Sequence, residues 1–166
     1  MTTENILARL FEHNNWANLR IIQACAALSD AQLDAEPQSV TKGSIRLTLT
    51  HLVASQHSYL SLLTLPAEAR QRIAPTFAEL QPAVTVSGER LLALARDEHT
   101  EFPKNRLQTT DGYFVEPWVI MLQAINHATE HREQICSMIS ALGMTPPDLD
   151  GWAFGVATGA LVSMAK

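Results

Sequence analysis

The chain has 166 residues, of which 46% are hydrophobic and 17% charged, and its formal net charge is -5. This length suits one hydrophobic core, so we expect residues 1–166 to form a single domain. The negative charge and the lack of a basic cluster argue against a nucleic-acid partner. The N-terminus has no signal-peptide core, and the apolar tail is interrupted by glycines. We therefore expect a cytoplasmic protein with no membrane contact.

Helical periodicity dominates the sequence, and no segment alternates as a β-strand does. From Thr3 to about Leu28, apolar residues recur at spacings of three and four, as on one face of a helix. Asn14 and Asn18 occupy two positions of the same stripe, where apolar residues would be expected. A polar loop containing a proline follows this first helix.

The next two helices are marked by their N-terminal residues. Ser44 predicts the N-cap of a second helix, which runs to about Leu65 and is ended by Pro66. Thr76 and Glu79 have the spacing of a capping box, which predicts the start of a third helix.

The middle of the chain contains two helix breakers. Pro82 and Gly88 predict a kink or a restart in the third helix. The Asp-Gly step at residues 111–112 predicts a tight turn in the connection that follows. A fourth helix begins near Pro117, a favoured first-turn residue, and ends before Gly143.

A shorter helix closes the chain after the sequence "TPPD". Its glycines at 151, 155 and 159 recur every four residues, so another helix can approach that face closely. A homodimer formed through this helix is one expectation. Four principal helices and a short last one predict an all-α fold, namely an antiparallel four-helix bundle with an additional short C-terminal helix.

The histidines carry the main functional signal. His127 and His131 lie four residues apart on the margin of the fourth apolar stripe, so both rings can reach one ion. His51 occupies the corresponding margin of the second helix. Three neutral imidazoles from facing helices would leave an open coordination position on a zinc-like ion. The alternative is three partly buried histidines that each form local hydrogen bonds.

The other histidines and cysteines have simpler interpretations. His57 and His99 are interpreted as surface residues. His13 is intermediate, and one option for it is to support the metal ligands through a hydrogen bond. Cys25 and Cys136 are interpreted as reduced core thiols. The sequence has no phosphate-binding glycine loop and no serine nucleophile elbow. A di-iron bundle would show Glu-x-x-His on two helices, whereas "ATEHREQ" offers only one carboxylate next to a histidine.

Three fragments, "HNNWANLRII", "LTHLVASQHSYLSLL" and "INHATEHREQICSMISALGMTPPDLDGW", resemble the bacterial DinB/YfiT-like family in the same order. The resemblance implies a four-helix bundle that binds a divalent metal (Zn, Ni or Fe) through His51, His127 and His131. Many members read "HHRGQ" where this chain has "EHREQ", so Glu130 and Glu133 make the rim of the site more acidic.

Two further residues are candidates for contact with a bound molecule. Asn18 is positioned to orient a ligand or a metal-bound water, or to form an interhelical hydrogen bond. Arg132, near the centre of the fourth stripe, is positioned to hold an anionic group of a thiol or substrate, or to extend past the edge of the core into solvent.

Several members of the family use a small thiol such as bacillithiol, mycothiol or glutathione. The resemblance therefore implies a metal-dependent small-thiol S-transferase of detoxification or stress response. Its partners would be a small-molecule substrate and a low-molecular-weight thiol. The alternatives are a metal- or ligand-binding bundle without catalysis, a metal-dependent hydrolase that uses the same open site, and a purely structural bundle.

Overall fold

The computed structural model describes residues 5–37, 43–96 and 102–164. Within these ranges the fold contains six α-helices, which are α1 (Ile6–Cys25), α2 (Asp30–Asp34), α3 (Ile45–Thr64), α4 (Leu80–Arg96), α5 (Pro117–Ala141) and α6 (Gly151–Ala157). Two short 3-10 helices, η1 (Ala67–Ala69) and η2 (Phe77–Glu79), precede α4. Strands β1 (Leu107–Gln108) and β2 (Phe114–Val115) form one antiparallel pair. The predicted helical bundle with a short C-terminal helix is confirmed.

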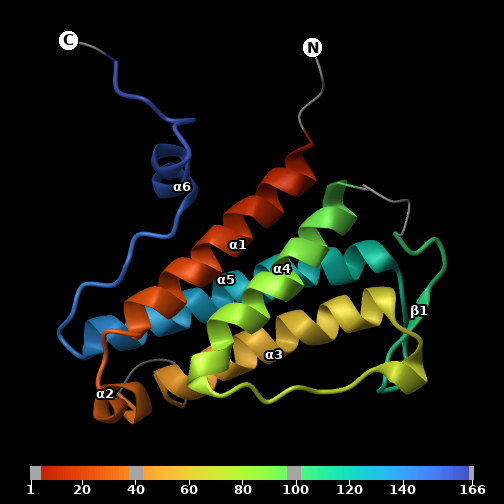
Figure 1. Cartoon of the computed structure of the whole chain (residues 1–166), viewed down its shortest axis with the longest axis horizontal. Helices are drawn as coiled ribbons and strands as arrows, with labels where there is room; N and C mark the ends of the chain where they lie inside the picture. Colours follow the sequence, from red (N-terminus) through yellow and green to blue (C-terminus); the bar gives the residue numbers. More distant parts are fainter. Residues whose placement is uncertain (1–4, 38–42, 97–101, 165–166) are drawn as a thin grey trace.

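The four long helices form a closed bundle. α1 packs against α4 and α5, and α3 packs against the same two helices from the other side. After α3, residues 65–79 return along the length of the bundle, so α3 and α4 run in the same direction (Figure 1). α3 and α5 run in opposite directions, as do α1 and α4. This topology places the middle of α3 beside the middle of α5.

The core consists of two apolar clusters, one toward each end of the bundle. The first gathers residues of α1, α3, α4 and α5 around Ile21, Leu49 and Ile135, and the second gathers residues around Phe11, Leu60 and Leu91. Between the clusters lies a polar layer of five buried residues from the four long helices. These residues are Asn14, Asn18, Gln56, Ser87 and Arg132.

Most predicted helix ends are confirmed. The Ser44 side chain accepts a hydrogen bond from the Leu47 backbone N–H (3.3 Å), and α3 ends at Thr64, before Pro66. α5 begins at Pro117 and ends two residues before Gly143, whose φ of +76° is the left-handed conformation of a helix C-terminus.

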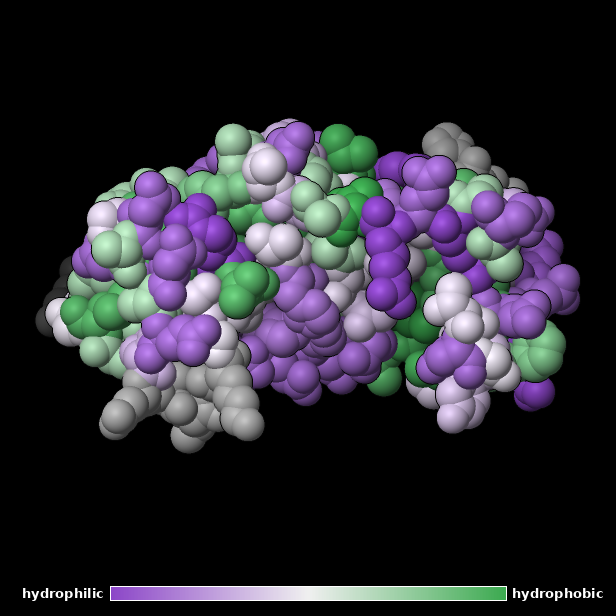
Figure 2. Space-filling model, turned by 90° about the horizontal axis from the view of Figure 1, so that it is seen from below, coloured by the Kyte–Doolittle hydropathy of each residue, from purple (hydrophilic) through white to green (hydrophobic). Residues whose placement is uncertain are grey.

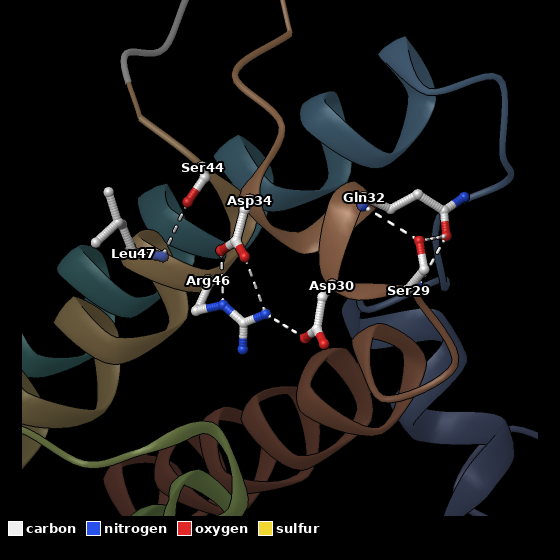
Figure 3. A network of polar contacts seen from close by, with 7 residues as sticks. All are labelled: Ser29, Asp30, Gln32, Asp34, Ser44, Arg46 and Leu47. Carbon is white, nitrogen blue, oxygen red and sulfur yellow. Dashed lines mark hydrogen bonds and ion pairs between the residues drawn. The ribbon is translucent and has the colours of Figure 1, made fainter.

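The segment between α1 and α3, expected to be loop, contains the additional helix α2. Ser29 and Gln32 form a capping box at its start. Arg46, in the first turn of α3, donates hydrogen bonds of 2.6 Å to Asp30 and of 2.6 and 3.2 Å to Asp34 (Figure 3). These contacts hold α2 against the start of α3. α1 accordingly ends at Cys25, earlier than predicted.

Of the kink or restart predicted in the third helix, the restart is wrong, because α4 is continuous from Leu80 to Arg96, and the kink stays a prediction. The segment starts as predicted, since the Thr76 backbone N–H donates to Glu79 (2.8 Å), but the α-helix itself begins only at Leu80. Pro82 therefore lies in the first turn, where a missing N–H costs nothing. Gly88 faces α1, and a Cβ there would lie 2.5 Å from the side-chain oxygen of Asn15.

The predicted tight turn joins β1 to β2, where Gly112 has a φ of +92°. Among the described residues, the glycines of the last helix do not form a contact face for another helix. Gly159 ends α6 with a φ of +73°, and Gly155 lies against Leu161. A homodimer through this helix stays a prediction.

The described part of the chain has no helix with both the length and the apolar character needed to cross a bilayer. Figure 2 shows the face that points downward in Figure 1. Hydrophobic residues form small separate groups there, among hydrophilic ones.

Candidate metal centre

The middle turns of α3 and α5 bring three histidines together. His127 and His131 are one helical turn apart on α5, and His51 lies opposite them on α3. The Nε2 atom of His127 lies 3.2 Å from the Nε2 of His51 and 3.1 Å from the Nε2 of His131. Candidate ligand atoms of all three rings lie within 4.8 Å of one another. The predicted convergence is therefore present.

These distances fit a shared cation better than hydrogen bonds between the rings. A single nitrogen of a neutral imidazole either donates or accepts, so the Nε2 of His127 cannot donate to one neighbour while accepting from the other. Three imidazole ligands at about 2.0–2.1 Å from a tetrahedral ion would place their nitrogens about 3.3 Å apart. Two of the three separations are already close to that value.

The orientation of His131 supports the same interpretation. Its Nδ1 lies 2.7 Å from the side-chain oxygen of Gln134, one turn further along α5. Because an amide oxygen only accepts, Nδ1 carries the proton and Nε2 keeps its lone pair toward the cluster. A ring held in this tautomer is the form that a metal requires.

The electrostatics also favour neutral rings. Burial lowers the pKa of His127 to about 4, with smaller contributions from His131 and His51. Burial, followed by His131, also lowers the pKa of His51. Both rings are thus neutral at pH 7. Because they are neutral, they can bind a metal without first releasing a proton.

One side of the cluster is bordered by Tyr59, which no sequence motif singled out. Its ring stands edge-on to the ring of His127, with 5.7 Å between centroids. Burial raises the pKa of the Tyr59 phenol, and a hydrogen bond with Gln123 partly offsets this effect. His51 is solvent-exposed, so the cluster is open to small molecules.

Asn18 and Arg132 lie in the polar layer and form no hydrogen bond with the histidines among the described residues. Nη1 of Arg132 donates to Asn14 (2.8 Å) and Asn18 (2.6 Å), and Nη2 donates to Thr129 (2.9 Å). Asn18 also donates to Gln56 across the bundle (2.9 Å). The interhelical hydrogen bond considered for Asn18 is therefore present. A role for either residue in binding a cofactor stays a prediction.

Arg132 does not extend into solvent, because only 3% of it is exposed. Burial lowers the pKa of its guanidinium to about 10, so the group keeps its charge at pH 7. Inside the bundle this charge faces amide and hydroxyl oxygens, and no described carboxylate lies within ion-pair distance of it.

The remaining histidines lie elsewhere. The proposed support role of His13 is wrong, because its Nε2 lies 2.8 Å from the carbonyl oxygen of Leu149 and its ring packs on Phe154. His57 is half-buried rather than a surface residue, and its Nδ1 is buried without a partner. His99 lies outside the described residues.

Neither cysteine is a ready nucleophile. Cys25 is buried and Cys136 half-buried, and both are free thiols, as predicted. Burial raises the pKa of Cys25 to about 12 and that of Cys136 to about 11. Both sulfurs are therefore protonated at neutral pH.

The fold and the cluster define a class: a helical bundle with a candidate three-histidine metal centre at the edge of two helices. Comparison with protein families gives the particular family. The model of the DinB family matches residues 1–159, and the chain belongs to this family. The comparison with curated proteins found no match.

Proposed function

We propose that this DinB-family protein is a metal-dependent enzyme that transfers a small thiol to an electrophilic substrate. The observation that carries the proposal is the convergence of three Nε2 atoms, with separations of 3.1 and 3.2 Å, at an exposed edge of the bundle. Zinc, nickel and iron all accept such a set of imidazole ligands.

His51, His127 and His131 would hold the metal, and Gln134 would fix the tautomer of His131. A metal held there would supply a Lewis acid that lowers the pKa of a thiol, so that a thiolate would be available at neutral pH. The protein's own cysteines are protonated and face the core, so the reacting sulfur comes from a separate small thiol.

The transfer balances without a redox partner. The thiol sulfur forms a bond to an electrophilic carbon, and that carbon loses its leaving group with the bonding electron pair. The thiol proton passes to solvent through the open edge beside His51. Tyr59 covers one side of the site and excludes water there, which strengthens the electrostatic interactions within it.

The first test is elemental analysis of protein purified without an affinity tag. About one equivalent of a transition metal is expected in the parent, and none in the triple variant His51→Ala, His127→Ala, His131→Ala. His57→Ala is the matched control, because His57 lies on α3 but outside the cluster. A parent that contains no metal and takes up neither zinc nor nickel would overturn the proposal.

The second test separates the candidate functions. Metal-loaded protein is incubated with glutathione and a chloronitrobenzene electrophile, and the thioether product is measured. Metal-dependent product formation that the triple variant lacks supports the transferase. Thiol binding without turnover would favour a binding protein, and cleavage of an ester without any thiol would favour a hydrolase.

A further inference from the structure

A cavity of about 290 Å³ is lined in part by Tyr59, the residue whose ring also borders the histidine cluster. α3 contributes Ser58 and Tyr59 to its wall, the returning segment contributes Arg70 and Arg72, and the β1–β2 turn contributes Thr109 and Thr110. Segments far apart in the sequence therefore build one small compartment. Its wall contains two cations and several hydroxyl groups, and no acidic residue.

Neither arginine of this cavity forms an ion pair with a carboxylate among the described residues. Arg70 is half-buried and held by two neutral acceptors, the carbonyl oxygens of Leu65 (3.0 Å) and Gln108 (2.6 Å). Arg72 is exposed, with neither an ion pair nor a hydrogen bond to any described residue. In a chain of net charge -5, two guanidinium groups together without a carboxylate form a local positive site. A planar guanidinium is suited to bind a carboxylate through two parallel hydrogen bonds.

The cavity is adjacent to the candidate metal centre. Tyr59 belongs to both, since it lines the cavity while its ring lies 5.7 Å from the ring of His127. A molecule that reaches from the arginines to the three histidines must therefore pass this ring. A volume of this size holds a carboxylate with a few carbon atoms and leaves the rest of the reactant outside.

We propose that this cavity binds a carboxylate group of one of the two reactants, the thiol or the electrophile, and so orients it toward the metal centre. The inference rests on the proposed function, whose substrate class it narrows to small molecules that carry a carboxylate. Arg70, held in place by backbone carbonyls, would supply the fixed partner, and Arg72 would close over the anion from the exposed side.

The first experiment uses metal-free protein and succinate as the probe, with binding followed by calorimetry. The test variant is Arg70→Gln with Arg72→Gln. The charge-matched control is Arg20→Gln with Arg90→Gln, two exposed arginines outside this cavity. We expect the test variant to bind succinate at least about tenfold more weakly than the parent, and the control to bind like the parent. Equal binding by all three proteins would overturn the proposal.

A single variant guards against a folding defect. Arg72 is exposed and forms neither a hydrogen bond nor an ion pair with any described residue, so Arg72→Gln alone should leave the thermal unfolding curve unchanged and still weaken succinate binding severalfold. A normal unfolding curve with unchanged succinate binding would count against a role for Arg72 and overturn the two-arginine site.

The second experiment uses cobalt-loaded protein, in which a bound thiolate gives a charge-transfer absorption band. Glutathione is compared with its diethyl ester, and succinate is added as a competitor. If the thiol's own carboxylate occupies the cavity, the ester binds about tenfold more weakly and succinate displaces glutathione. If the electrophile's carboxylate occupies it, both thiols bind equally while succinate binding still depends on the arginines.

The two proposals fail in different ways. Succinate binding that depends on the arginines, in a protein that no thiol binds, would support the anion site and contradict the transferase. Metal-dependent thiol transfer, together with succinate binding that is unchanged when Arg70 and Arg72 are replaced, would contradict the anion site and leave the transferase proposal standing.

Discussion

Replacing Arg132 by methionine is expected to destabilise the bundle from within its polar layer. The guanidinium is 3% exposed and donates to Asn14, Asn18 and Thr129 at 2.6 to 2.9 Å. Methionine fills much of the same space but donates no hydrogen bond. The two asparagine oxygens would then remain buried without a partner, whereas Thr129 is exposed and can bond to water.

The magnitude follows from these contacts. Each orphaned buried oxygen costs about 1–3 kcal/mol, which gives roughly 2–6 kcal/mol for two. Release of the buried charge offsets part of this cost. We therefore expect the free energy of unfolding to fall by about 3 kcal/mol.

A second substitution, Asn14→Leu, distinguishes lost hydrogen bonds from a general packing defect. It should stabilise the Arg132→Met variant, whereas a packing defect would be made worse. Nδ2 of Asn14 is already buried without a partner. In the parent, Asn14→Leu loses one hydrogen bond to Arg132 and removes this orphan, so its net effect should be within about 1 kcal/mol. In the Arg132→Met background the whole amide is unpaired, and Asn14→Leu should restore about 2 kcal/mol.

The assay is urea unfolding at pH 7 with a chelator present, so that metal binding does not contribute to the measured free energy. The parent, the two single variants and the double variant are compared with one common m-value, the slope of the free energy of unfolding against urea concentration. The reasoning would be refuted if Arg132→Met cost less than about 0.5 kcal/mol. It would equally be refuted if Asn14→Leu changed the stability by the same amount in both backgrounds.

Three further predictions follow from local geometry. The pKa of His127 is about 4 in the folded chain against 6.5 when unfolded, so the unfolded chain binds the proton first. The free energy of unfolding of the metal-free protein should thus be highest above pH 6.5 and fall by about 1–2 kcal/mol toward pH 4. This magnitude is reduced because solvent screens the charge of a half-buried ring. Urea unfolding across this range should show a weaker pH dependence in His127→Gln. Gly88→Ala should cost about 1–2 kcal/mol, because the new Cβ would lie 2.5 Å from Asn15, and adding Asn15→Ala should recover most of it in thermal unfolding. Gln134→Leu frees the ring of His131, so zinc affinity measured against a chelating dye should fall about tenfold, while an unchanged affinity would contradict its orienting role.

Sequence predicts those parts of the fold that depend on local chemistry. The caps at Ser44 and Thr76 and the helix start at Pro117 are set by side chains within a few residues, and all three are confirmed. The helix α2 carried a local signal, the Ser29 capping box, but five residues of helix need an anchor. That anchor is Arg46 on another helix, which no local pattern identifies.

The candidate site shows the same division. The spacing of His127 and His131 fixes their proximity, since one turn of helix separates them. The contact with His51 depends on α3 and α5 running in opposite directions with one particular alignment, which periodicity does not determine. Asn14 and Asn18 stood out in the sequence as polar residues in an apolar stripe. Their partner Arg132 lies more than a hundred residues away in the sequence. The hydrogen bonds between them could therefore not be predicted from the local sequence of either segment.

The polar layer and the metal centre depend on the same alignment of α5. Arg132 directly follows His131, so on a helix their side chains point about 100° apart, one into the bundle and one to its edge. If α5 slid or rotated by one residue, Arg132 would lose both asparagine oxygens, and His131 would move away from His51. Sliding therefore carries the cost of a buried, unpaired charge, which apolar residues would not impose. This predicts that Arg132→Met weakens zinc binding at least about tenfold although all three histidines remain, because the alignment is no longer fixed. Unchanged zinc affinity in a destabilised Arg132→Met variant would mean that the layer contributes stability alone.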